Sequence, residues 1–402
     1  MHSKIKNIAQ AFHPAQLSAL ATYLLKDEAI SGKLILGATI LALIAANTAL
    51  RTAYDGLWNM QLSIGVGDWV LSKDLRHWID EGLMAIFFLV VGLELKRELV
   101  KGELRRLKTA SLPFAAALGG MVVPAVLYLI ITRGTGASNG WAIPMATDIA
   151  FAVAILAFVG KGIPASIRLF LLTLAIVDDI GAVVIIALFY SSGINLYMLG
   201  IAATIALLFA ALHTYRLLSM PLFVGGSILL WLAVEQSGIH ASIAGAVIGL
   251  LAPLATRKDE HESIAERLEK RTIPLSTLIV VPLFAFASTG IAFSLDIFSD
   301  SRTAPIAGGI ILGLVVGKVL GIVGASWLMI RLKISELPSG SSWNHVIGVG
   351  LLAGIGFTVS IFVTELAFEE EQLIQAAKIS IFIASAISGG LGIVALKYFA
   401  KK

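Results

Sequence analysis

Four charged side chains lie near the middle of apolar segments, where hydrocarbon would otherwise surround them. They are Asp178 and Asp179 in 166–190, Asp148 in 141–159 and Lys318 in 305–330. A charged side chain at the centre of a membrane helix costs about 2.5–3.5 kcal/mol on insertion scales. One that is retained there is therefore a candidate functional residue. Burial against a structural partner would explain one such residue more easily than four.

The two neighbouring acids offer the clearest chemistry. Asp178 and Asp179 lie about 100° apart around a helix, so both can border one cavity. Two carboxylates this close cannot easily both be ionised in a low dielectric, so we expect them to titrate as a unit. When ionised they offer the oxygen ligands that a small hard cation prefers, and when protonated they release it. Competition between a proton and a cation for these oxygens is sufficient for exchange of one for the other.

The composition shows what kind of element positions these charges. The chain has 402 residues, of which 57% are hydrophobic and 14% are charged, whereas soluble domains carry about 25% charged residues. Apolar runs of roughly 20 residues, long enough to cross a bilayer, recur along the chain. We therefore expect an all-α integral membrane protein with a single transporter domain over 1–402 and about twelve spans. The spans are expected at 34–50, 76–96, 109–132, 141–159, 166–190, 195–215, 220–236, 240–254, 274–292, 305–330, 345–366 and 372–396.

The segments between the spans predict the orientation. With the N-terminus inside, 23 lysines and arginines fall on the inner side and six, Lys378 among them, on the outer side, which satisfies the positive-inside rule with both termini cytoplasmic. The excess of basic residues therefore indicates the orientation in the membrane and does not indicate nucleic-acid binding. Residues 1–33 are expected to be a cytoplasmic segment with an amphipathic surface helix at 14–27, and 397–402 a cytoplasmic tail. Residues 60–73 read as a small β-hairpin outside the bilayer.

Two spans carry helix-breaking residues at their centres. One contains Pro144 and the Thr147-Asp148 pair, and the other contains Gly354 and Gly356. These are the fourth and eleventh spans, each the middle of a three-helix unit, so we expect inverted repeats of spans 3–5 and 10–12 with two broken helices crossing at mid-membrane. Glycines that serve only close helix packing are the alternative.

The crossing would bring helix ends of both signs together. Asp148 could offset the positive ends and Lys318 the negative ends. Alternatively, Lys318 could pair directly with Asp178 and exchange that partner for a proton.

These residues together resemble the NhaA-type sodium/proton antiporters. The matching motifs, in order along most of the chain, are Phe87–Leu99, Ala146–Ala152, Leu174–Val183, Ser237–Ala241, Pro282–Ala287, Gly317-Lys318 and Gly354–Phe362. The resemblance implies a secondary transporter of the bacterial inner membrane, not an enzyme, that exports Na⁺ or Li⁺ in exchange for H⁺. It further implies electrogenic, pH-activated exchange serving sodium tolerance and pH homeostasis, and a homodimer formed through the 60–73 hairpin.

The resemblance also implies roles for single residues. Asp178 and Asp179 would bind the cation and exchange protons, with Thr147 nearby, and Asp148 and Lys318 would compensate charge at the crossing. A pH-response cluster would comprise Glu94, Arg97, Glu98 and Glu269, although their chemistry fits a solvated charged rim equally well. Two departures from the family pattern are Val319, where proline often follows the lysine, and Ser288-Thr289, where Asn-Ala is usual.

Other functions are possible for buried acids. A proton-coupled carrier of another solute is the nearest alternative, and an intramembrane aspartyl protease is a more distant one because its acids come from two helices. A passive channel would need weak, multiple ion sites. No phosphate-binding loop is present, so we expect no cofactor and an ion gradient as the driving force. His240 reads as a helix-end or packing residue.

Overall fold

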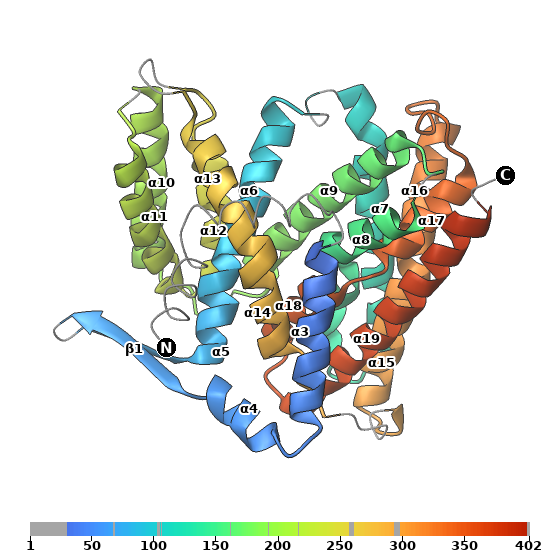
Figure 1. The fold of residues 1–402 in the computed structure, drawn as a ribbon, viewed down its shortest axis with the longest axis horizontal. Coiled ribbons are helices and arrows are strands. Elements are labelled where there is room, and N and C mark those ends of the chain that lie inside the picture. The colour runs from blue at the N-terminus through green and yellow to red at the C-terminus, as the bar shows by residue number, and fades with distance from the viewer. Residues whose placement is uncertain are drawn as a thin grey trace, which may run out of the picture.

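The computed structural model describes residues 30–399 except 67–68, 103–104, 106, 161, 192, 216, 257–260 and 293–297. The predicted amphipathic helix at 14–27 and the end of the C-terminal tail lie outside the described residues. Within them the chain is mostly helical (Figure 1). The α-helices are α3 (Ile30–Ala46), α4 (Arg51–Trp58), α5 (Leu75–His77), α6 (Met84–Val100), α7 (Leu107–Ile131), α8 (Ile149–Val159), α9 (Ala165–Phe189), α10 (Leu196–Thr214), α11 (Met220–Glu235), α12 (Ala241–Leu251), α13 (Ile264–Leu275), α14 (Val281–Ser288), α15 (Thr303–Leu312), α16 (Lys318–Arg331), α17 (Trp343–Ala353), α18 (Phe357–Ala367) and α19 (Glu371–Val394).

Five further helical segments extend or connect these helices. Four are π-helical, η1 (Trp78–Leu83), η4 (Ser276–Val280), η6 (Gly313–Gly317) and η7 (Ala395–Phe399), and one is a 3₁₀ helix, η3 (Ser138–Met145). Two antiparallel strands, β1 (Gln61–Val66) and β2 (Trp69–Asp74), form the hairpin predicted at 60–73, with Gln61 paired to Asp74 and Val66 to Trp69.

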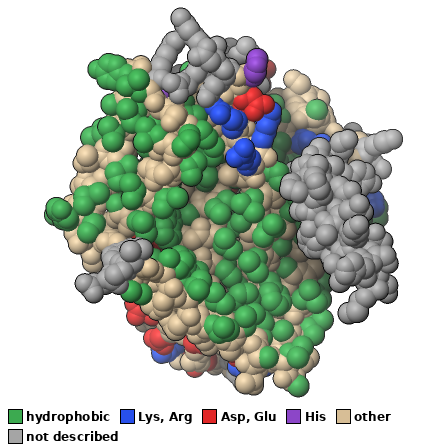
Figure 2. Space-filling model, turned by 60° about the vertical axis from the view of Figure 1, so that its left-hand side comes forward, with side chains coloured by type: hydrophobic (Ala, Val, Ile, Leu, Met, Phe, Trp, Pro, Cys, Tyr) green, Lys and Arg blue, Asp and Glu red, His purple; other side chains and the backbone are tan. Residues whose placement is uncertain are grey.

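The helices form a membrane-embedded bundle. Seven helices in the described part of the chain are long and apolar enough to cross a membrane, or up to nine if each of two bent pairs counts as one span. Helices α11 and α12 are apolar but shorter. The surface over α10 and α11 is a broad apolar face, with charged side chains gathered toward its ends (Figure 2). The count of twelve spans and the inverted repeats remain predictions.

We call the end of the bundle that carries the β-hairpin the hairpin side. Helix α4, η1 and the end of α14 lie at this side (Figure 1), where the Tyr54 hydroxyl of α4 donates to the Phe286 carbonyl at 2.5 Å. Helices α6 and α10 end at the opposite side, and α9 and α17 begin there.

Close helix contacts fix the position of Lys318. Helix α16 crosses α7 at Gly119 and Gly321, where a Cβ on either glycine would lie 2.2 Å or less from the carbonyl oxygen of the other. Only glycine permits this approach. Because Gly321 lies three residues after Lys318, the crossing holds the lysine inside the bundle, where its exposed fraction is 0%.

The predicted spans fall on helices, but their limits differ at α3 and near α13: the span expected at 34–50 begins and ends four residues late, since α3 runs from Ile30 to Ala46. The span expected at 274–292 begins ten residues earlier, at Ile264. Ser263 and Glu266 form a capping box that starts this helix, satisfying backbone N–H groups that would otherwise lack partners. One further correction concerns Lys378: counted with the outer segments, it is buried within α19.

Candidate functional site

Two helix interruptions meet at the centre of the bundle. The chain leaves helical geometry between η3 and α8, at 146–148, and between α17 and α18, at 354–356, where the helix bends by 45°. The Asp148 N–H donates to the Ile355 carbonyl at 2.6 Å, and the Thr147 hydroxyl donates to the Ala353 carbonyl at 2.9 Å. The freed backbone groups of one interruption are thus satisfied by the other, as required where water is scarce.

The Asp148 carboxylate serves the first turns of two helices. One of its oxygens accepts the Phe151 N–H at 3.1 Å, which caps α8. The other oxygen accepts the Thr358 N–H at 3.1 Å and the Thr358 hydroxyl, at the start of α18. Helix N-termini carry partial positive charge, so a carboxylate shared by two of them is stabilised by both. The carboxylate thus lies at the crossing, and its charge-compensating role there stays a prediction.

The two glycines of the second interruption lie close to neighbouring helices. A Cβ at Gly354 would lie 2.4 Å from the Leu314 carbonyl oxygen and 2.6 Å from the Ser388 hydroxyl. A Cβ at Gly356 would lie 2.1 Å from the Ser360 hydroxyl. Gly354 therefore excludes a side chain, because a Cβ there would meet the backbone of η6, whereas the atom nearest to a Cβ at Gly356 is the rotatable Ser360 hydroxyl.

Lys318 pairs with Asp178. Its ammonium lies 2.7 Å from one Asp178 carboxylate oxygen, and the two side chains are 0% and 1% exposed. Of the two positions expected for this lysine, the direct pairing with Asp178 is present, and a role against the helix ends stays a prediction. The other Asp178 oxygen is buried without a hydrogen-bond donor in the part of the chain that the structure describes. Thr147 lies beside this carboxylate.

Asp179 is the least compensated of the buried acids. It is 4% exposed, and its carboxylate makes no hydrogen bond or ion pair within the described ranges. The charged groups that act on it are the carboxylates of Asp178, Glu94 and Asp148, together with the ammonium of Lys318. Burial among like charges makes Asp179 a candidate site for binding a proton or a cation.

The predicted pH-response residues lie together at the side opposite the hairpin. Arg97 donates to Glu269 at 3.1 Å, joining α6 to α13. Glu94 interacts electrostatically with Arg97, Glu98 and Glu269. Glu94 also acts electrostatically on Asp179, so the charges at this end of the bundle influence the buried pair.

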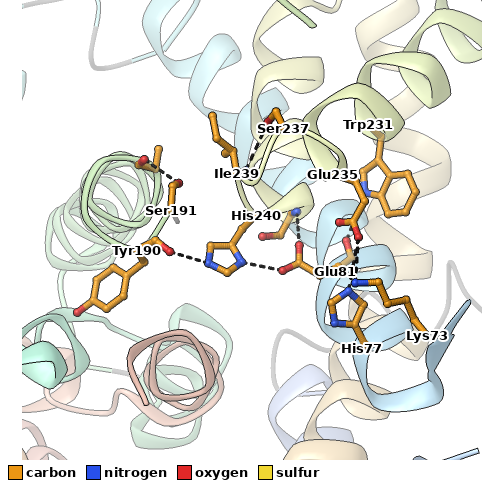
Figure 3. A network of polar contacts seen from close by, with 12 residues as sticks. Lys73, His77, Glu81, Tyr190, Ser191, Trp231, Glu235, Ser237, Ile239 and His240 are labelled. Atoms are coloured by element: carbon orange, nitrogen blue, oxygen red, sulfur yellow. Dashed lines mark hydrogen bonds and ion pairs between the residues drawn. The ribbon is translucent and has the colours of Figure 1, made fainter. Parts of the chain in front are cut away.

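A second polar network, which the sequence did not predict, lies at the hairpin side (Figure 3). His240, immediately before α12, approaches the Glu81 carboxylate at 2.8 Å and the Tyr190 carbonyl at 3.0 Å. Glu81 also accepts the Ser242 N–H at 3.1 Å. The network connects η1 and α12 to the end of α9, the helix that carries Asp178. The helix-end interpretation of His240 is compatible with its place but missed its partners, which are 159 and 50 residues away.

Sequence comparisons place the chain among known proteins. The family model described as Na⁺/H⁺ antiporter 1 matches residues 22–396. The chain is 43% identical over 373 residues to a protein of Clostridium beijerinckii named Na⁺/H⁺ antiporter NhaA 1, covering 92% of this chain and 93% of the relative. It is also 43% identical over 392 residues to the Na⁺/H⁺ antiporter NhaA of Rhodospirillum rubrum, covering 95% and 97%. With a matching model over most of its length and relatives this similar from end to end, the chain belongs to the Na⁺/H⁺ antiporter 1 family.

Proposed function

We propose that this chain exports Na⁺, or Li⁺, in exchange for H⁺, and that the exchange takes place at Asp178 and Asp179. Membership of the family makes the chain a secondary transporter of the membrane and not an enzyme, which removes the protease alternative. The observation that carries the proposal is the buried Asp178–Lys318 pair beside an Asp179 whose carboxylate has no partner among the described residues. The acid pair and the Thr147 hydroxyl supply oxygen ligands of the kind that Na⁺ and Li⁺ prefer.

Lys318 gives the exchange a second proton. A cation that binds between Asp178 and Asp179 competes with the ammonium of Lys318 for the same carboxylate. Displaced from its counterion in a low-dielectric interior, the ammonium is destabilised and releases its proton. Asp179 releases another when the cation binds. Two protons against one cation make the exchange electrogenic.

A cavity supports access from the side opposite the hairpin. It has a volume of about 480 Å³ and lies between the first turns of α7 and α9 and the segment 333–339. Its wall includes Thr173, five residues before Asp178 and thus about 7.5 Å away along the axis of α9. Asp178 and Asp179 themselves are nearly closed to solvent, so alternating access requires the helices around them to move.

Further parts of the proposal concern the surroundings of the site. We propose twelve spans with inverted repeats, both termini in the cytoplasm of a bacterial cell and the hairpin in the periplasm, as the charge distribution favours. The hairpin exposes Leu62, Ile64 and Val70, an apolar strand surface that supports contact with a second copy. Glu94, Arg97, Glu98 and Glu269 would activate exchange as pH rises.

Exchange by purified protein in vesicles tests the central proposal. Added Na⁺ or Li⁺ should collapse a pre-formed pH gradient, and K⁺ should not. Asp179→Asn should abolish this response. Asp55→Asn, which removes a half-exposed carboxylate 3.6 Å from Arg51 on α4, is the matched control and should leave it unchanged. An Asp179→Asn variant that exchanges at the wild-type rate would remove the assignment.

A further inference from the structure

A charged cluster at the hairpin side has no part in the exchange described so far. Lys378 of α19 forms an ion pair with Glu365 of α18, and both side chains are largely buried. Asp80 of η1 lies within electrostatic range of this pair, and Glu365 acts on it more strongly than Lys378 does. Within the described residues, the one hydrogen bond that its carboxylate accepts is long, at 3.5 Å from the Ser288 hydroxyl at the end of α14.

The other charged groups near Asp80 do not neutralise it. Glu81, the next residue, is held by His240 and by the Ser242 N–H (Figure 3). Arg76 acts on Asp80 from α5 but forms no ion pair within the described residues. One ammonium therefore pairs with Glu365 and also acts electrostatically on Asp80, a second carboxylate from a different helix.

Helix α18 connects this cluster to the crossing. Thr358, Phe362 and Glu365 follow the spacing of four and three residues that places side chains on one helix face. Thr358 binds Asp148, and Glu365 lies seven residues further on, about 10 Å along the helix axis. This face of α18 therefore leads from the buried acids to the hairpin side.

Aromatic rings close that route between its two ends. Phe362 packs against Phe88 of α6 at a centroid distance of 5.5 Å and against Phe284 of α14 at 6.2 Å. All three rings are 2% exposed or less. Phe88 lies in α6, which continues from η1, and Phe284 lies in α14, as Ser288 does. Phe362 lies in α18, as Glu365 does. The rings and the charged cluster therefore both lie where η1, α6 and α14 face α18.

We propose that Asp80, Glu365 and Lys378 are positioning residues that act as a charged gate above the aromatic rings, on the hairpin side of the exchange site. Repulsion between Asp80 and Glu365 favours separation of η1 and α14 from α18, and Lys378 opposes it by neutralising the acids. The balance of these charges sets how often the hairpin side opens. The inference rests on the proposed function for the direction of transport, but the gate residues are distinct from the exchange site at Asp178 and Asp179.

The gate can be tested with a single-cysteine reporter, because the chain contains no cysteine. Val91 lies three residues after Phe88, one turn further from the hairpin side, and is buried. In intact cells, Val91→Cys is treated with a membrane-impermeant methanethiosulfonate reagent and its labelling rate is measured. Ser72→Cys on the exposed face of the hairpin should label at once if the hairpin side faces outward. If it does not label, the proposed orientation is wrong, and the same series is read in inverted membranes.

Loss of either acid and loss of the lysine should change the labelling rate of the reporter in opposite directions. Asp80→Asn and Glu365→Gln each remove one of the repelling acids and should slow labelling of the Val91→Cys reporter about tenfold, a change of roughly 1.4 kcal/mol in the opening equilibrium. Lys378→Met leaves the two acids facing each other and should speed labelling by about the same factor. The double variant Asp80→Asn with Lys378→Met should return toward the starting rate.

A matched control separates this gate from ordinary charge loss. Glu370→Gln removes the exposed partner of Arg302, next to the start of α19, and should leave labelling unchanged. Changes of the same sign in all charge variants, or no change, would overturn the gate. Failure of Asp179→Asn to abolish exchange would instead overturn the proposed function and leave the labelling result standing.

Discussion

Removal of the Lys318 side-chain charge tests whether the buried ion pair holds the structure as its geometry indicates. Lys318→Met keeps an unbranched chain of similar length and leaves the Asp178 carboxylate buried with no cation at 2.7 Å. Breaking a buried pair by removing one partner costs about 3–5 kcal/mol. Asp179, next in sequence, adds a second acid to the uncompensated site. We therefore expect a loss of stability at the upper part of this range.

The loss can be expressed as an unfolding temperature. Unfolding entropy is about 2.1 cal/mol/K per residue, which for a chain of this length gives roughly 0.8 kcal/mol/K. A loss of about 3–5 kcal/mol then lowers the unfolding temperature by roughly 4–6 °C. The double variant Asp178→Asn with Lys318→Met buries no unpaired charge, since neutral groups of similar size replace both partners. It should recover most of the loss.

Unfolding of purified protein in detergent, followed by tryptophan fluorescence at one heating rate, measures both variants. The chain has seven tryptophans to report it. The double-mutant cycle isolates the energy of the pair from the effects of each substitution. A Lys318→Met variant that unfolds at the wild-type temperature would refute the reasoning. A double variant no more stable than the single one would do the same.

Three further predictions concern the crossing and the charged end of α6. Thr358→Val removes the hydroxyl that donates to Asp148 and should cost about 1–3 kcal/mol of stability, whereas Thr358→Ser should be nearly neutral in the same unfolding assay. Gly354→Ala should lower the yield of folded protein, because the added Cβ meets a carbonyl oxygen at 2.4 Å; Gly324→Ala, in open space, should not. Arg97→Gln removes the cation beside Glu269, so nearby carboxylates should hold protons to higher pH and the exchange-against-pH profile should shift to the alkaline side. An unchanged profile would place Arg97 outside the pH response.

Hydropathy predicted the helices closely where the sequence is uniformly apolar. The span expected at 166–190 differs from α9 by one residue at each end, because its limits coincide with the change from polar to apolar residues. The span at α13 was placed too late because its first turns are charged and hydropathy favoured the apolar part. The Ser263-to-Glu266 spacing was a start signal available in the sequence.

The members of the candidate site were predictable, but their partners were not. A lysine in the middle of a span indicates a function because inserting its charge into the membrane costs free energy. Whether Lys318 reaches Asp178, however, depends on the rotation of α16 at its crossing with α7. Asp148 and Thr358 are 210 residues apart, and no local pattern links them. Asp80 and His240 gave no signal because charged residues near the ends of spans are ordinary.

The mutual dependence of the two interrupted helices has a consequence for biosynthesis. The Asp148 N–H finds its acceptor at Ile355, which the ribosome adds 207 residues later. At synthesis rates of about 5–20 residues per second, the first interruption is synthesised roughly 10–40 s before the second, which supplies its hydrogen-bond acceptor. Until then the nascent segment must keep its open backbone against water or the insertion machinery. We therefore expect the core to assemble only after the last spans have been synthesised. If the two halves are produced as separate polypeptides, they should gain native structure only when both are in the same bilayer.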